Sequence, residues 1–237
     1  NTTGSYNIAI GVGSLYLNTA SYNTSVGHNA LLNNTTGTPN DAFGFQALYS
    51  NTTGGNNVGV GYQALFSNTT GFRNIAIGTQ ALYGNTSGFQ NVAVGAISLV
   101  NNTIGTENTA LGYYTLNANT TGSYNVAIGA QALGYNTTGS GSIAIGYLTL
   151  ASNTASNNTG VGYAALRQNT TGTPNDAFGY AALYSNTTGA YNVAVGSQSL
   201  YANTTGANNT SVGHNSLASN LVGVHRDRKS TRLNSSH

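Results

Sequence analysis

Two histidines and two aspartates that recur at equivalent places of the sequence are the side chains whose types and positions could support acid–base chemistry. His28 and His214 occupy equivalent places directly after a glycine, and no carboxylate or nucleophile recurs beside either one. Asp41 and Asp176 both occur in the segment TPNDAFG, 135 residues apart, where Pro and Asn are typical of a turn. We therefore expect exposed turn histidines and isolated aspartates, with no catalytic pair, and we do not expect an enzyme.

Glycine-rich and cysteine-based motifs also give no sign of a cofactor or metal site. The segments Gly11-Val12-Gly13 and Gly59-Val60-Gly61 lack the following helix that would bind a phosphate. The chain has no Cys, which excludes disulfides, thiolate catalysis and Cys-based zinc sites. We expect neither a cofactor nor a metal.

Asparagine and threonine recur in the tetrapeptide Asn-Thr-Thr-Gly and permit three interpretations. The Asn-x-Thr/Ser triplets are possible glycosylation sites in a secreted protein, or they are simply good turn-forming sequences. Threonine pairs such as Thr120-Thr121 could form hydroxyl ladders, as in ice-binding solenoids, although those proteins place Thr at alternate positions of a flat strand. The possible glycosylation sites are Asn51, Asn68, Asn119, Asn136, Asn169 and Asn186.

Charge is scarce and unevenly distributed. Charged residues make up 4% of the 237 residues, against about 25% in ordinary soluble domains. Residues 1–225 contain two basic and three acidic residues, so no basic face is available to neutralise phosphates and we expect no nucleic-acid partner. No apolar run approaches the roughly 20 residues that a membrane-spanning helix needs, so we expect no membrane insertion within this segment.

A unit of seventeen residues, repeated through most of the chain, is the element that must position all these side chains. Eleven units have seventeen residues and two have sixteen, because NTTG is shortened to NTA. Strict periodicity argues for a solenoid and against a flexible low-complexity linker. The units begin at Asn1, Asn18, Asn34, Asn51, Asn68, Asn85, Asn102, Asn119, Asn136, Asn153, Asn169, Asn186 and Asn203.

Besides the opening Asn, one glycine and one leucine are present in every unit. We interpret the glycines as turn residues and the leucines as core residues of the stacked coils. The turn glycines are Gly11, Gly27, Gly44, Gly61, Gly78, Gly95, Gly112, Gly129, Gly146, Gly162, Gly179, Gly196 and Gly213. The core leucines are Leu15, Leu31, Leu48, Leu65, Leu82, Leu99, Leu116, Leu133, Leu150, Leu166, Leu183, Leu200 and Leu217.

The pattern N-x-A-[IVLF]-G before each turn glycine predicts a short strand. We expect its last, apolar residue to point inward, and the small residue before it to allow close approach of another surface. A second short strand is expected around the leucine, as in residues 131–133, with a one-turn helix as the competing interpretation. The inward apolar residues expected are Ile10, Val26, Phe43, Val60, Ile77, Val94, Leu111, Ile128, Ile145, Val161, Phe178, Val195 and Val212.

The domain organisation follows from where the repeat persists. Residues 1–219 hold thirteen repeats, and 220–226 are the start of a truncated fourteenth. Residues 18–50 return at 153–185 with eight of 33 positions changed, which indicates duplication of an eight-unit block. Residues 227–237, DRKSTRLNSSH, match the translation of a common sequencing-library adapter, so we expect a non-native, disordered tail there.

The segment NVAIGAQAL, residues 125–133, resembles the head repeat of YadA-like trimeric autotransporter adhesins. The match is carried by residues 125–129 with Ala132, and by their equivalents over residues 1–219. The resemblance implies a left-handed parallel β-roll, three copies of which associate side by side. Units of that family usually have about fourteen residues, and NTTG is the insertion that distinguishes this chain. Similar repeats occur in predicted tail-fibre shafts of phages and large viruses.

The resemblance implies an extracellular or cell-surface protein that self-associates as a homotrimer or filament. The first expectation is an adhesin segment that attaches to host or environmental surfaces through an unidentified ligand. The alternatives are a structural fibre, including a virion fibre, and, as a minor one, an ice-binding solenoid. Tyrosines that follow the core leucine could form a binding face or pack between chains. They include Tyr49, Tyr83, Tyr184 and Tyr201.

Overall fold

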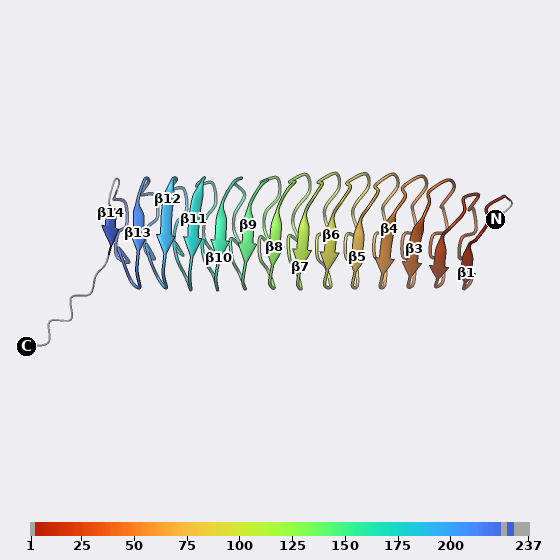
Figure 1. Cartoon of the computed structure of the whole chain (residues 1–237), viewed down its shortest axis with the longest axis horizontal. Coiled ribbons are helices and arrows are strands. Elements are labelled where there is room, and N and C mark those ends of the chain that lie inside the picture. The colour runs from red at the N-terminus through yellow and green to blue at the C-terminus, as the bar shows by residue number, and fades with distance from the viewer. Residues whose placement is uncertain (1–2, 224–226, 230–237) are drawn as a thin grey trace, which may run out of the picture.

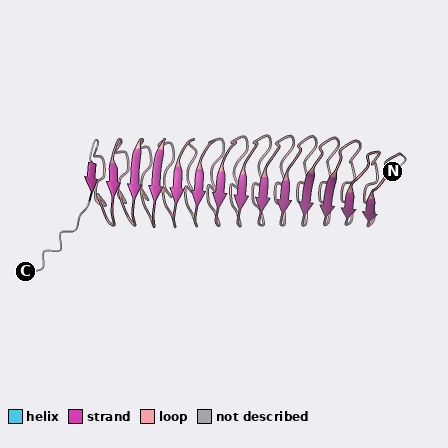
Figure 2. Cartoon of the chain, viewed as in Figure 1, coloured by secondary structure: helices cyan, strands magenta, loops and turns pink. Residues whose placement is uncertain are grey.

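The computed structural model describes residues 3–223 and 227–229, which form a rod in which the chain winds as a β-solenoid (Figure 1). Each coil contributes one short strand, and the fourteen strands form a single parallel sheet in chain order. The described residues contain no helix (Figure 2). The predicted all-β parallel solenoid with seventeen-residue turns is confirmed. The strands are β1 (Ile8–Ile10), β2 (Thr24–Val26), β3 (Asn40–Phe43), β4 (Asn57–Val60), β5 (Ile75–Ile77), β6 (Val92–Val94), β7 (Thr109–Leu111), β8 (Val126–Ile128), β9 (Ile143–Ile145), β10 (Thr159–Val161), β11 (Asn175–Phe178), β12 (Asn192–Val195), β13 (Thr210–Val212) and β14 (Asp227–Lys229).

The strand register follows the length of the sequence repeat. Val126 pairs with Ile143, seventeen residues later, and Ile143 pairs with Thr159, only sixteen residues later. The shortened unit therefore keeps the sheet in register, because its missing residue lies in the turn before the strand, where backbone length is most easily adjusted.

The central residue of each strand faces the interior, which corrects the predicted core. Ala127 is fully buried between Val126 and Ile128, both of which are partly exposed. Alternation along a strand places only one of the three side chains inside. The interior admits only a small one: a Cβ built on Gly59, the central residue of β4, would lie 3.4 Å from Leu48 Cγ. The residues that face outward, contrary to the prediction, are Ile10, Val26, Phe43, Val60, Ile77, Val94, Leu111, Ile128, Ile145, Val161, Phe178, Val195 and Val212.

The repeated leucine is the largest side chain of the interior, as predicted, but it does not lie in a second strand. Twelve of these leucines are at most 3% exposed, and Leu217 packs against them. Gln131 and Leu133 have left-handed backbone angles, φ 58° and 50°, so the chain bends around the leucine. Two left-handed residues together cost about 2–4 kcal/mol, and burying a leucine stabilises by about 1.5–3 kcal/mol. Burial of the leucine therefore offsets most of the unfavourable backbone energy, and each coil has one strand instead of two.

Two rows of asparagine occupy the rest of the interior. In the first row, the opening asparagine donates from Nδ2 to the Oδ1 atom of the coil before it, as Asn119 does to Asn102 at 2.8 Å. In the second row, Asn125 donates from its backbone N–H to Asn108 Oδ1 at 3.0 Å. Both rows are buried, and most of their amides bond to each other and to the turn carbonyls. The interior is thus apolar around leucine and hydrogen-bonded around asparagine.

The predicted turn glycine allows successive coils to stack closely. Gly129 has φ +116°, and a Cβ built on it would lie 2.7 Å from the carbonyl carbon of Gly146 in the next coil. All thirteen equivalent glycines have φ between 116° and 143°. Since the left-handed region and the close approach both exclude a side chain, glycine is required at this corner.

The end of the chain adds one short strand. Residues 227–229, which lie in the segment expected to be a disordered, non-native tail, form β14, and Thr210 pairs with Asp227 at the seventeen-residue spacing. The backbone at these three positions extends the sheet by using the hydrogen-bonding groups that the edge of β13 presents. The rest of that tail, residues 230–237, lies outside the described residues, as do 224–226 of the truncated repeat.

Candidate interaction surfaces

The residues that could perform acid–base chemistry are kept apart by the solenoid. Asp41 lies in β3 and Asp176 in β11, eight coils apart, which at about 4.8 Å per strand is roughly 38 Å. His28 stacks on Phe45 with ring centroids 5.4 Å apart. His214 lies 3.1 Å from the Asn215 amide, measured between Nε2 and Nδ2. Within residues 3–223 and 227–229, no group of three His, Asp or Glu side chains could hold a metal ion.

The Gly-x-Gly segments lie at strands and their turns and lack the geometry of a phosphate-binding loop. Gly59-Val60-Gly61 spans the end of β4 and the turn that follows it. Gly11-Val12-Gly13 forms the equivalent turn after β1. Neither segment leads into a helix in the described chain, so no helix N-terminus is available to an anion at either place.

The six asparagines that the sequence marks as possible glycosylation sites lie in the first interior row. All six are fully buried, and Asn119 Nδ2 donates both to Asn102 Oδ1 and to the carbonyl of Gly122. A glycan attached to Nδ2 would remove a hydrogen atom from this pair of bonds and would have no space beside the neighbouring coils. The folded rod therefore contradicts glycosylation at Asn51, Asn68, Asn119, Asn136, Asn169 and Asn186.

The first threonine of each NTTG segment uses its hydroxyl within the rod. Thr120 Oγ1 donates to the carbonyl of Thr137 at 3.1 Å, and Thr52 Oγ1 donates to Thr69 in the same way. These donors are not directed at solvent. The second threonine, such as Thr121, is exposed beside the turn and does not lie on a strand.

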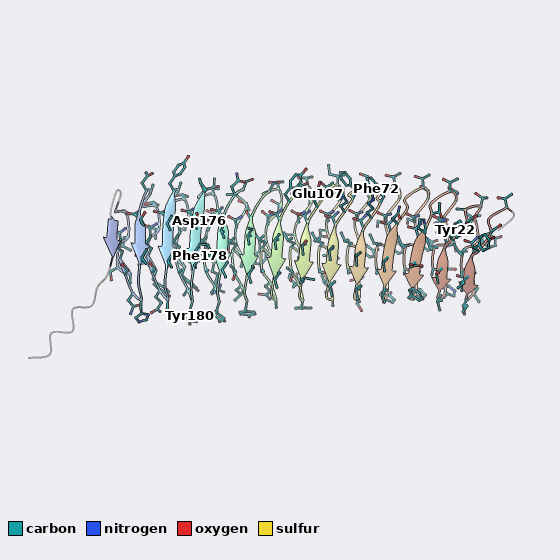
Figure 3. The ribbon with its side chains drawn as sticks, in the orientation of Figure 1. Tyr22, Phe72, Glu107, Asp176, Phe178 and Tyr180 are labelled. Carbon is teal, nitrogen blue, oxygen red and sulfur yellow. The ribbon has the colours of Figure 1, made fainter. Side chains whose placement is uncertain are left out.

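The outward side of the strands forms a long apolar surface, which we call the sheet face. It consists of the first and last outward side chains of the three-residue segments 8–10 to 210–212 that pair in β1 to β13, as Val126 and Ile128 do in β8. Ile77, Ile145 and Phe178 are 41%, 37% and 41% exposed. Threonine, Asp41 and Asp176 are the polar interruptions of these two rows. Figure 3 shows Asp176 and Phe178 along one strand of this face.

Stacked aromatic rings form two rows along the rod, one directly after the core leucines and one directly after the turn glycines. The tyrosines after the core leucine stack with partly exposed rings, as in Tyr49–Phe66–Tyr83 and Tyr184–Tyr201. The Arg167 guanidinium lies over the Tyr184 ring, 5.7 Å from its centroid. A second row, directly after the turn glycine, was not recognised from the sequence. It contains the stacks His28–Phe45–Tyr62 and Tyr147–Tyr163–Tyr180.

The missed row has a simple sequence signal. Aromatic residues two positions after the last strand residue recur at intervals of sixteen or seventeen residues, and the parallel register brings equal positions of neighbouring coils side by side. Figure 3 shows Tyr180 at the lower edge of the rod, opposite Phe72 and Glu107 at the upper edge.

Comparison with known proteins identifies no relative. No protein-family model matches the chain, and neither a curated protein nor a solved structure matches it. In the part of the chain that the structure describes, no helix has the length and apolar character to cross a bilayer. The surfaces themselves are therefore the basis for a functional proposal.

Proposed function

We propose that residues 1–219 are a segment of an extracellular surface adhesin that associates with further copies through the sheet face. The observation that supports this is the apolar outer surface of β1 to β13, where the last strand residue is Ile, Val, Leu or Phe in every coil. Contiguous apolar patches larger than a few hundred Å² are rare on monomeric proteins and are typical of interaction sites.

The size of the sheet face suits a second copy of the same chain. Thirteen strands spaced by about 4.8 Å, each about three residues long, give a face of roughly 60 by 10 Å. Two such faces would bury about 1,200 Å² in total, which is the lower bound of specific, stable interfaces. Two copies also have side-chain rows of equal period, so ridges of one can pack between ridges of the other along the whole length. The resemblance to trimeric adhesin heads makes a homotrimer the expected assembly.

Attachment of the adhesin to a surface would depend on many weak contacts that are repeated along the rod. Stacked aromatic rings recur at several places along the rod, as in Tyr49–Phe66–Tyr83 and Tyr184–Tyr201. Individually weak contacts of this kind gain apparent affinity when several are held in one assembly, because each further contact forms without a new encounter in solution. This role places the chain at a cell surface or in the extracellular space.

A structural fibre is the second candidate. The observation that favours it is the repetitive interior, in which a leucine, a small residue and asparagines recur from coil to coil with similar bonds in most coils. Such a rod is suited to act as a spacer in a filament or a virion fibre. In that case the sheet face still joins copies, and the edges bind nothing.

Lysine substitutions on the sheet face test the proposal. The variant Ile77→Lys, Ile128→Lys, Ile145→Lys places three charges in the contact, where unpaired buried charges strongly oppose association. We expect light scattering to give an oligomer for the wild type and the 24.2 kDa monomer for this variant. The matched control is Thr70→Lys, Thr121→Lys, Thr138→Lys, which adds the same charges to exposed residues of the same three coils and should leave the oligomer intact.

The same three proteins separate the adhesin from the fibre. On bare glass and on mucin-coated sensors, the adhesin role predicts strong retention of the wild type and the control, with much faster release of the monomeric variant. Oligomers that fail to adhere to either surface would support the fibre. A wild type that is monomeric at all concentrations would contradict both functions.

A further inference from the structure

Tyrosine is the side chain of this protein that a one-electron oxidant attacks most readily. The chain has 16 Tyr and no Cys, Met or Trp. Cysteine and methionine are the usual first targets of oxidation, and a cysteine thiol readily reduces a tyrosyl radical. Since none of these residues is present, a radical formed on a tyrosine of this chain persists until it meets another tyrosine.

Along the edge of the sheet face, three tyrosines lie next to one another in consecutive coils; elsewhere in the rod, adjacent tyrosines occur as the pairs Tyr6–Tyr22 and Tyr184–Tyr201. Tyr147, Tyr163 and Tyr180 each lie two residues after the last residue of β9, β10 and β11. The ring centroids are 5.4 Å apart between the first two and 5.3 Å apart between the last two. The three side chains are 45%, 49% and 54% exposed, so an oxidant can reach them and the rings can turn about their side-chain bonds.

We propose that the stack Tyr147–Tyr163–Tyr180 is a site of dityrosine formation that covalently joins successive coils. A peroxidase with hydrogen peroxide removes one hydrogen atom, as an electron and a proton, from each of two phenols. The two radicals form a carbon–carbon bond between the ring carbons next to the hydroxyl groups. Each of those carbons then loses its hydrogen as a proton, and each phenolic oxygen regains one. Overall, two tyrosines lose two hydrogen atoms, and one peroxide is reduced to two waters.

Other stacks in the same rod provide internal comparisons. His28–Phe45–Tyr62 occupies the same row and contains only one phenol, so no coupling is possible within it. In Tyr49–Phe66–Tyr83, the ring of Phe66 separates the two phenols. The proposal does not depend on what the rod binds or on whether copies associate, because the cross-link forms within one chain.

Tryptic cleavage makes the cross-link visible. The full chain is treated with horseradish peroxidase and hydrogen peroxide, the monomeric product is isolated under denaturing conditions, and trypsin is added. Within residues 1–225, cleavage occurs only after Arg73 and Arg167. A bond from Tyr163 to Tyr180 joins fragment 74–167 to fragment 168–226. The expected product has the sum of their masses less two hydrogen atoms and shows dityrosine fluorescence.

Two substitutions test the stack with opposite expected results. Tyr163→Phe keeps the stacked ring but separates the remaining phenols, and it should abolish the joined fragment. Phe66→Tyr completes the other stack, and it should create a new bond between fragments 1–73 and 74–167, which the wild type lacks. Circular dichroism establishes that each variant is folded. An oxidised wild type without the joined fragment, a joined fragment that persists in Tyr163→Phe, or no new bond in Phe66→Tyr would overturn the proposal.

Discussion

At the scale of the residue, the opening asparagine of each coil is an interior hydrogen-bonding group. Asn119 Nδ2 donates to Asn102 Oδ1 and to the carbonyl of Gly122, and its Oδ1 atom accepts from Asn136 Nδ2 at 3.1 Å. A primary amide can donate twice and accept within one small planar group, which neither a hydroxyl nor a carboxylate can do. This requirement explains why asparagine opens every unit.

Replacing this amide by a carboxylate should destabilise the rod strongly. Asn119→Asp removes both donors and places a buried charge against the acceptor oxygens of Asn102 and Gly122. Leaving an uncompensated charge in such a place costs about 3–5 kcal/mol. We expect the free energy of unfolding to fall by that amount, measured by urea denaturation followed by circular dichroism.

The control for this substitution is Asn101→Asp, at the end of the coil that begins at Asn85. The Asn101 side chain is exposed and makes one bond, to the carbonyl of Asn117 at 3.0 Å. Its loss should change the free energy of unfolding by only about 1 kcal/mol. Equal urea midpoints for the two variants would show that the interior amide row does not stabilise the rod.

At the scale of the element, the sequence was sufficient to place the strand but not to orient it. Repetition of N-x-A-[IVLF]-G fixed the strand and its turn glycine, and both lie where expected. The prediction that the last strand residue points inward was wrong. It assumed that the largest apolar side chain of a strand is buried, and this holds only where the core is wide enough for that side chain. Here the strand passes close to the leucine of its neighbouring coil, so alanine fits inside and isoleucine does not. The fact that the central residue is always Ala, Ser or Gly was the available signal.

The second strand was also predicted wrongly, for a related reason. Residues 131–133 form backbone bonds to both neighbouring coils, as a strand would, with Leu133 N–H donating to the Thr149 carbonyl at 3.0 Å. The alternating left-handed residues that turn the leucine inward cannot be read from residue type, because leucine is uncommon in that conformation. Tertiary packing thus overrides the local preference of the backbone.

A substitution at the turn glycine tests the stacking of elements. Gly129→Ala introduces a Cβ at φ +116° and 2.7 Å from the backbone of the next coil. Such strain costs about 1–3 kcal/mol before any shift of the neighbouring coil is counted. We expect a lower melting temperature and faster amide hydrogen exchange in β8 and β9.

Gly134→Ala is the matched control within the same coil. The nearest atom to a Cβ at this position is the Gln131 carbonyl oxygen, at 3.2 Å, and no atom of another coil approaches it as closely. Two other coils have alanine at the equivalent position, Ala151 and Ala218, and most of the rest have larger side chains there. This variant should unfold like the wild type, and an equal loss of stability in both variants would contradict the role given to the turn glycine.

At the scale of the whole molecule, the interior records the eight-unit duplication that the sequence suggests. The first asparagine row is continuous from Asn18 to Asn136 and resumes from Asn153. Between them the sixteen-residue coil shifts Asn153 Nδ2 onto the carbonyl of Ala155, and Asn136 Oδ1 is left buried without a partner. The hydrogen-bonded interior is therefore built in eight-coil blocks, whereas the sheet and its outer face continue unbroken across the junction.

Association of copies through the sheet face is the central proposal for the whole molecule, and a thiol-labelling experiment tests it most directly. The chain contains no Cys, so a single introduced one is a unique probe. Ile128→Cys lies on the sheet face, and Thr121→Cys lies on an exposed turn of the same coil. We predict that, in concentrated protein, a maleimide labels the Ile128→Cys variant much more slowly than the Thr121→Cys variant. On dilution, the two labelling rates should converge. Rapid and equal labelling at every concentration would contradict association through the sheet face.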